Sequence, residues 1–359
     1  MRSLRKSFNN SAPGKNRGGY SRFQNRRGQS GENINPSKFV NKLLPNRGAE
    51  QFAPIHSFAD FKVDDSLKQA IGMKGYITPT PIQDRTIPHI LEGKDVLGIA
   101  NTGTGKTGAF LIPLINKVRK NSKEQVLIIV PTRELAIQID NELREFVTGM
   151  KIFSVCVVGG MPIGRQISKL RYQYNFIIGT PGRLKDLIDR RMIHLSEFST
   201  VVLDEADRML DMGFINDMRA VMAGMRKERQ TLFFSATLSP VIEKLISEFL
   251  KNPIRVSVKY GDTAKNVDQD VVRVGQGGSK LDILHTLLIK REEFRKVLVF
   301  GRTKRGVEKL SEMLVKRGIK AESIHGNKNH SQRQRALGKF KDNHSQVLVA
   351  TDVAARGLD

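Results

Sequence analysis

The sequence is poor in cysteine, in aromatic residues and in long apolar runs. Cys156 is the only cysteine in 359 residues, which excludes a disulfide framework and any zinc site built on several cysteines. We expect Cys156 to be a buried apolar residue. No run approaches the about 18 apolar residues that a membrane-spanning helix needs, and the N-terminus lacks the apolar core of a secretory signal. These absences predict a soluble, cytoplasmic protein that does not span a membrane.

Acidic residues are too few to balance the basic ones. The 36 Asp and Glu residues face 60 Lys and Arg residues, which gives a formal net charge of +24. Charge of this size indicates a polyanionic partner, either a nucleic acid or an acidic membrane surface. The length is sufficient for two domains, each with its own hydrophobic core, so no disulfide or metal is required for folding.

The first 50 residues differ in composition from the rest. They contain eleven Lys and Arg residues against two acidic ones, a net charge of +9, and almost no aliphatic residue before Phe39. Such a segment cannot bury enough apolar surface to offset its ordering entropy, so we predict a disordered basic tail over residues 1–52. Arg and Gly interleaved with Tyr20 and Phe23 suit loose contact with single-stranded nucleic acid. A solvated tail and a transit peptide are the alternatives.

From Phe52 onward, short apolar runs alternate with helical periodicity. Leu135, Ile139, Leu143 and Phe146, for example, fall on one face of a helix. Continuous β-branched and aliphatic runs are typical of strands that are covered on both faces of a parallel sheet. The alternation predicts an α/β fold with doubly wound parallel sheets. The predicted strands cover residues 95–100, 126–130, 153–158, 176–179, 201–204, 231–235, 297–300 and 347–350.

Residues 251–270 lack a clear period and indicate a linker between two domains. We therefore expect a first domain over residues 53–258, a linker over 259–267 and a second domain over 268–359. Gly-rich, hydroxyl or charged residues follow each apolar run directly. Because ligands bind at the carboxyl ends of parallel strands, one edge of each sheet is expected to carry most of the chemistry.

The stretch "ANTGTGKT" follows a predicted strand and precedes a helical pattern. Ala100 replaces the first Gly of the strict P-loop pattern, but the residues that act on phosphate are present. Gly residues allow backbone N–H groups to surround phosphate oxygens, a Lys supplies positive charge, and a Thr hydroxyl can bind Mg²⁺. The predicted nucleotide-binding residues of this loop are Thr102, Gly103, Thr104, Gly105, Lys106 and Thr107.

The stretch "VVLDEAD" supplies the carboxylates that a phosphoryl-transfer site needs. Asp204, at the end of the strand, is expected to hold Mg²⁺ together with Thr107, largely through water. Glu205 is expected to orient or deprotonate a water molecule. Acidic clusters are usually solvated faces, but the apolar run that precedes this one favours a site.

These motifs occur in a familiar order. "GYITPTPIQ" with Phe58 upstream, "ANTGTGKT", "PTRELA", "GG", "TPGR", "DEAD", "SAT", "VLVFGRT", "Q-x-x-R" and "ATDVAARGLD" resemble the motifs of DEAD-box RNA helicases over Phe52 to Asp359. The resemblance implies two RecA-like parallel-sheet domains in tandem, the second incomplete. It also implies ATP and Mg²⁺ as cofactors and RNA as the partner; protein partners remain unknown.

The resemblance assigns roles at the nucleotide site. Gln83 would read the adenine edge and Phe58 would pack on the base, which favours ATP; taken alone, they could be a helix residue and a core aromatic residue. Ser235 and Thr237 would hydrogen-bond Asp207 and so connect the nucleotide site to strand separation, although a helix N-cap is the local alternative. The catalytic residues implied are Lys106, Asp204, Glu205, Asp207, Ser235 and Thr237.

The resemblance also implies a face that contacts the RNA backbone. Its hydroxyls, Gly amides and Arg side chains suit sugar and phosphate, so binding should be sequence-tolerant and sensitive to salt; a single Arg could equally be a surface ion-pair partner. Asn101, Gly108, Arg302 and Asn327 depart from the usual family residues and affect only fine specificity. The RNA-binding residues implied are Thr132, Arg133, Gly160, Thr180, Arg183, Arg302, Thr303, Gln332, Arg335 and Thr351.

The leading hypothesis is a bacterial ATP-dependent RNA helicase or RNA chaperone that unwinds short duplexes locally. Asp359 would reach the ATP ribose, and Arg356 and Gly357 would shape the cleft. The family's next motif carries paired arginines and would lie beyond Asp359, so we expect a truncated chain with impaired catalysis. An RNA-binding protein without effective ATPase is therefore the alternative; a motor on double-stranded DNA is disfavoured by "PTPIQ" and "DEAD".

Overall fold

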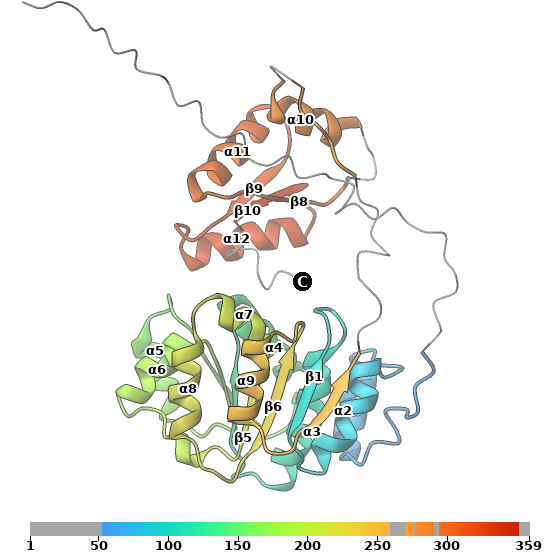
Figure 1. Cartoon of the computed structure of the whole chain (residues 1–359), viewed down its shortest axis with the longest axis vertical. Helices are drawn as coiled ribbons and strands as arrows, with labels where there is room; N and C mark the ends of the chain where they lie inside the picture. Colours follow the sequence, from blue (N-terminus) through green and yellow to red (C-terminus); the bar gives the residue numbers. More distant parts are fainter. Residues whose placement is uncertain (1–51, 259–269, 276–277, 291–293, 352–359) are drawn as a thin grey trace, which may run out of the picture.

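The structure is a computed structural model that describes residues 52–258, 270–275, 278–290 and 294–351. The predictions for the N-terminal tail, for the linker and for Arg356, Gly357 and Asp359 lie outside these residues. Two separate parallel sheets, each flanked by helices, make up the described chain (Figure 1). This arrangement confirms the predicted α/β fold with two tandem domains. No helix of the described residues is long and apolar enough to cross a membrane.

The first domain is built on a seven-stranded sheet with the order β3-β4-β2-β5-β6-β1-β7 and parallel pairing throughout. β1, β2, β4, β5 and β6 are buried at every residue, as continuous apolar runs predict for strands covered on both faces. The strands are β1 (Val96–Ile99), β2 (Val126–Ile129), β3 (Ser154–Val157), β4 (Phe176–Gly179), β5 (Thr200–Leu203), β6 (Gln230–Ser235) and β7 (Ile254–Ser257).

Helices cover both faces of this sheet. Successive residues of a strand point to opposite faces, so Ile128 joins one hydrophobic cluster and Ile129 the other. α1 to α4 pack in the first cluster and α6 to α9 in the second. The helices are α1 (Asp65–Met73), α2 (Pro81–Leu91), α3 (Lys106–Lys120), α4 (Arg133–Phe146), α5 (Ile163–Leu170), α6 (Pro181–Asp189), α7 (Ala206–Asp211), α8 (Ile215–Gly224) and α9 (Pro240–Phe249), with a 3-10 turn at Leu195–Glu197.

The second domain contains a three-stranded sheet within the described residues, with the order β8-β10-β9. β10 is central and buried, whereas the residues of β8 alternate between half-buried and exposed. The elements are α10 (Lys280–Lys290), β8 (Val297–Phe300), α11 (Lys304–Lys316), β9 (Ala321–Ile324), α12 (His330–Lys341) and β10 (Val347–Ala350).

All eight predicted strands are confirmed to within one residue, but two strands were not predicted. β7 lies in the segment that we expected to begin a linker, and β9 has the polar sequence "AESI". Both are strands because they pair with buried neighbours, β7 with β1 and β9 with β10. Cys156 on β3 is half-buried rather than buried, and burial raises the pKa of its thiol to about 12.

Candidate functional site

The loop between β1 and α3 has the conformation of a phosphate cradle. Gly103 and Gly105 have φ values of 76° and 91°, in the left-handed region that favours glycine. Lys106 begins α3 and is buried; its Nζ donates to the carbonyl oxygen of Ala100 at 3.2 Å. The same Nζ lies 3.9 Å from Asp204 Oδ1. The ammonium is therefore held at the carboxyl edge of the sheet before any nucleotide is bound.

The acidic motif follows β5 and begins α7. Asp204 is 2 % exposed, and burial raises the pKa of its carboxyl group, against the effect of the nearby Lys106 ammonium. Glu205 caps α7 in the left-handed region, with φ of 52°, and its carboxylate pairs with Arg208 at 3.0 Å. A non-glycine residue in this conformation is uncommon, and such backbone strain concentrates at functional sites.

The donor set at this edge suits a magnesium ion held mainly by water and phosphate. Thr107 supplies a half-buried hydroxyl from α3, and Asp204 supplies a carboxylate from the end of β5. Among the described residues, no group of three or more His, Cys, Asp or Glu side chains could hold a metal by itself. Magnesium usually keeps several waters and takes only one or two protein carboxylates, so these residues fit the predicted ion.

Gln83 is buried beside the phosphate cradle, with 2 % of its surface exposed. Its Oε1 accepts the backbone N–H of Thr80 at 3.0 Å, and its Nε2 donates to the carbonyl oxygen of Gly105 at 3.0 Å. One N–H and one lone pair of the amide are thus used by the protein, and its second N–H and second lone pair are left for a base.

Phe58 lies in the hydrophobic core in this structure. Its ring packs edge-on against Phe61 and Tyr76, with centroid separations of 5.8 and 5.7 Å. The alternative given above, a core aromatic residue, describes this position, and stacking on a base stays a prediction. The departure at Gly108 has a physical reason, because a Cβ there would lie 2.9 Å from Gln83 Nε2 and 3.0 Å from Tyr76 Cε1.

The "SAT" turn is joined to the acidic motif by Thr237. The backbone N–H and the hydroxyl of Thr237 both donate to Asp207 Oδ2, each at 2.9 Å. The expected bond from Ser235 to Asp207 is wrong, because the single hydroxyl proton of Ser235 is donated to the carbonyl oxygen of Thr237 at 2.8 Å. Ser239 is the N-cap of the following helix, so the "SAT" turn is not that helix's cap.

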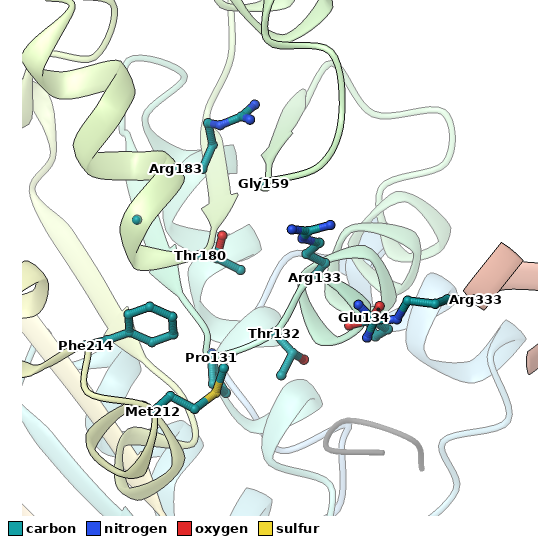
Figure 2. Close-up of a pocket in the computed structure, with 11 residues that line it drawn as sticks. Pro131, Thr132, Arg133, Glu134, Gly159, Thr180, Arg183, Met212, Phe214 and Arg333 are labelled. Carbon is teal, nitrogen blue, oxygen red and sulfur yellow. Dashed lines mark ion pairs between the residues drawn. The ribbon is translucent and has the colours of Figure 1, made fainter. Parts of the chain in front are cut away.

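A pocket of about 400 Å³ opens at the same edge of the first sheet. Arg133, Arg183, Thr132 and Thr180 all line it, as Figure 2 shows. Gly160 is also close, since a Cβ on it would lie 1.9 Å from an Nη atom of Arg133. All five predicted RNA-binding residues of the first domain are thereby brought together.

Positive charge converges on this pocket. Arg333 reaches it from α12, and its Nη2 lies 2.8 Å from Glu134 Oε1 (Figure 2). Burial lowers the pKa of the Arg133 guanidinium, and the charges of Arg333 and Arg183 lower it further, against the effect of Glu134. Arg183 is held by its bond to the carbonyl oxygen of Met161 at 3.2 Å. Guanidinium groups brought this close favour an anion between them.

Comparison with known proteins agrees with this geometry. The model of the DEAD/DEAH box helicase family matches residues 80–245, and that of the helicase conserved C-terminal domain matches residues 279–359. The chain is also similar to the crystal structure of a DEAD box protein from Methanococcus jannaschii. The two share 36% identity over 84% of this chain and 82% of that one, with a TM-score of 0.55. The chain belongs to the DEAD-box helicase family.

Two curated members of the DEAD-box family are similar to this chain over part of their own length. It is 47% identical over 306 residues to the DEAD-box ATP-dependent RNA helicase CshA of Bacillus subtilis (strain 168), and 46% identical over 304 residues to the ATP-dependent RNA helicase CshA of Limosilactobacillus reuteri. Each match covers 84% of this chain but 61% of the relative. The chain thus spans about three fifths of the length of these relatives.

The DEAD-box motif residues of the second domain lie apart from the pocket. Arg302 and Arg335 are exposed, and Thr351 is buried at the end of β10. Thr303 caps α11 by accepting the N–H of Gly306 at 3.0 Å, while Gln332 accepts the N–H of Asn329 at 2.9 Å in the capping box of α12. In the described part of the chain, none of these five lines the pocket.

Seven lining residues of the pocket were not predicted individually. Four of them stand inside the quoted motifs, whereas Arg333, Met212 and Phe214 occupy no defined motif position. Arg333 lies between Gln332 and Arg335 in chain order, so it could have been suspected from its place within the "Q-x-x-R" motif. Met212 and Phe214, between α7 and α8, form an apolar wall of the pocket (Figure 2). In the sequence they are notable only because they follow the acidic motif by a few residues. That position does not indicate that they line a pocket with the arginines.

Proposed function

We propose that this chain is the core of an ATP-dependent RNA helicase or RNA chaperone that binds the RNA backbone and separates short duplexes locally. The observation that carries the proposal is that a phosphate cradle and an arginine pocket lie at the same edge of one sheet. The cradle follows β1, whereas Thr132 and Thr180 follow β2 and β4. The carboxyl edge of the first sheet could therefore bind the phosphates of ATP and the backbone of RNA at the same time.

The nucleotide site would take the phosphates of ATP. Lys106 would release Ala100 and bind the β- and γ-phosphates, while Thr107 and Asp204 would hold the water shell of Mg²⁺. The ion would neutralise charge that develops on the phosphates. Glu205 would orient the attacking water, for which its ion pair with Arg208 provides a fixed starting position.

A connection between the two sites is supported by the bonds from Thr237 to Asp207. Asp207 lies in α7, directly after the acids of the nucleotide site, and Thr237 follows β6. Met212 and Phe214 follow the same helix and reach the arginine pocket. A shift of α7 during ATP turnover would therefore be felt at both sites.

The RNA would lie along the arginine pocket with its phosphates on Arg133 and Arg183. The Thr hydroxyls beside them suit ribose and phosphate oxygens, so binding would tolerate different sequences and weaken with salt. Arg302, Thr303, Gln332, Arg335 and Thr351 would join only after the second domain moves. The bacterial relatives support a bacterial protein, and we propose that it acts in the cytoplasm on RNA, with domains at 53–258 and 268–359.

A second candidate is an RNA-binding protein with little ATPase activity. It is favoured by the internal bonds of Gln83, since Thr80 and Gly105 leave only one N–H and one lone pair of the amide for a base. The match to the Bacillus subtilis relative covers 61% of that protein, so the ATPase activity of this chain has to be measured directly.

The first test is the ATPase rate of the full chain with and without a single-stranded RNA. We expect Lys106→Ala to abolish ATP binding, because it removes the buried ammonium. Glu205→Gln should retain binding and slow turnover by about 10²- to 10⁴-fold, the usual contribution of a positioned acid–base group.

Two outcomes would contradict the proposal in different ways. Equal RNA-stimulated ATPase rates in the wild type, Lys106→Ala and Glu205→Gln would exclude the assigned nucleotide site. RNA binding by a wild type that never turns over ATP would select the RNA-binding candidate instead.

A further inference from the structure

A buried carboxylate fastens the start of the first domain to the helix that carries Gln83. Asp84, on α2, is 1 % exposed. Its Oδ2 accepts the backbone N–H of Ile55 at 3.0 Å, and its Oδ1 accepts the backbone N–H of His56 at 3.0 Å. The Nδ1 atom of His56 lies 2.7 Å from the same Oδ1. These bonds join two segments that are almost thirty residues apart, and we call Asp84, Ile55 and His56 the clamp.

The clamp sets the position of the aromatic residues behind the phosphate cradle. The His56 ring lies 5.7 Å from that of Phe61, which in turn contacts Phe58. Phe58 packs on Tyr76, and Tyr76 approaches Gly108 at the start of α3. A continuous series of packed side chains thus runs from the clamp to the helix that begins the phosphate site.

The clamp also meets the nucleotide site through Gln83, the neighbour of Asp84 in sequence. Gln83 Nε2 donates to Gly105 in the cradle and lies 2.9 Å from the position of a Cβ on Gly108. Asp84 therefore fixes, from one side chain, both the first turn of α2 and the segment that leads to Phe58. Lys106 and Asp204 are anchored separately, after β1 and β5.

We propose that Asp84 is a positioning residue for recognition of the nucleotide base, acting through the clamp. The inference rests on the proposed function, since it assumes that Gln83 and the Phe58 segment select ATP. Loss of the clamp should loosen the base-recognising residues while leaving the phosphate contacts of Lys106 intact. The expected signature is a loss of selectivity for ATP over GTP, which a general loss of stability would not produce.

The test is calorimetric titration of the full chain with Mg²⁺ and either ATP or GTP. Asp84→Ala removes all acceptors of the clamp and should weaken ATP binding by about tenfold, with a smaller change for GTP. Asp60→Ala is the matched control, because among the described residues the Asp60 carboxylate accepts hydrogen bonds from Ser57 alone, at 2.7 Å, within the same N-terminal segment. It should leave both affinities within about twofold of the wild type.

Thermal unfolding without nucleotide shows whether each variant is folded. A folded Asp84→Ala with the wild-type ratio of ATP to GTP affinity would overturn the inference. If Asp84→Ala does not fold, His56→Ala decides, because it removes only one clamp bond at a side chain that is 38% exposed. An unchanged ratio there would also overturn the clamp. A wild type without any preference for ATP would instead contradict base selection itself, and with it both proposals.

Discussion

The two sheets of the molecule differ in how they hold their functional residues. In the first domain, β1, β2, β4, β5 and β6 are buried along their whole length, and the phosphate cradle and the acidic motif directly follow β1 and β5. In the second domain β8 exposes Leu298 and Phe300, at 37% and 58%. Packing therefore holds the site residues of the first domain in place. The position of Arg333 at the pocket depends instead on how the second domain lies relative to the first.

The largest effect expected from this difference is on stability. Phe234 on β6 is fully buried, packs on Phe110 at 5.6 Å and fills the space beside Gly98. Phe234→Ala should lower the free energy of unfolding by about 3 to 5 kcal/mol, because it leaves a cavity in a core that is covered on both sides. Phe300→Ala should change it by less than about 0.5 kcal/mol, since that ring is already exposed to water.

Denaturant unfolding followed by circular dichroism measures both variants. A destabilisation by Phe300→Ala as large as that by Phe234→Ala would show that the exposed ring of β8 is covered in solution. The contrast between the two sheets would then be wrong.

The difference between the sheets also explains which features could be predicted from the sequence. Apolar runs such as residues 126–130 are read correctly because burial on both faces leaves a continuous signal. β9 was missed because Glu322 and Ser323 have polar partners, an ion pair with Lys339 and a bond to Glu308, that compensate them. Local sequence does not reveal such partners, since they come from elements elsewhere in the chain.

The functional site shows the same limit. The residues of the phosphate cradle were predicted because their chemistry is local to one loop. The bond from Gln83 to Gly105 and the approach of Arg333 to Glu134 were not, because each depends on packing between distant segments. The burial of Phe58 was given only as the alternative to base stacking. Motif order thus predicts which residues take part, but not their partners in this structure.

A smaller effect is expected at the contact between the domains. The Arg333–Glu134 pair joins α12 to α4, with side chains 16% and 8% exposed. Arg333→Ala should weaken this association by about 1 kcal/mol, because the freed carboxylate can be hydrated when the domains separate. Small-angle scattering at low ionic strength should show a larger radius of gyration for the variant. Added salt should expand the wild type in the same direction.

The matched control for this contact is Arg190→Ala. Arg190, the C-cap of α6, pairs with Asp186 of that helix at 2.6 Å, so its loss leaves the domain contact intact. Equal radii for the wild type and Arg333→Ala, or equal expansion in both variants, would contradict a role for Arg333 in holding the domains together.

The smallest effect concerns two carboxyl groups, one in each domain, whose pKa values are shifted in opposite directions. Burial raises the pKa of Glu142, against its bond from the Tyr76 hydroxyl at 2.8 Å, whereas Arg317 and Ser279 lower the pKa of the exposed Asp282. A carboxyl group whose pKa is raised in the folded protein contributes stability at low pH, and this stability is lost as pH rises through the pKa of the folded state. A carboxyl group whose pKa is lowered contributes stability at higher pH, and this stability is lost as pH falls through the pKa of the folded state. Glu142→Gln keeps an acceptor for Tyr76 without the charge, so relative to the wild type it should gain stability, by less than about 1 kcal/mol, as pH rises above about 4.5. Asp282→Asn should lose relative stability over the same rise, and urea titrations at several pH values measure both trends. If the stability of both variants relative to the wild type changed in the same direction with pH, the opposite pKa shifts of Glu142 and Asp282 would be wrong.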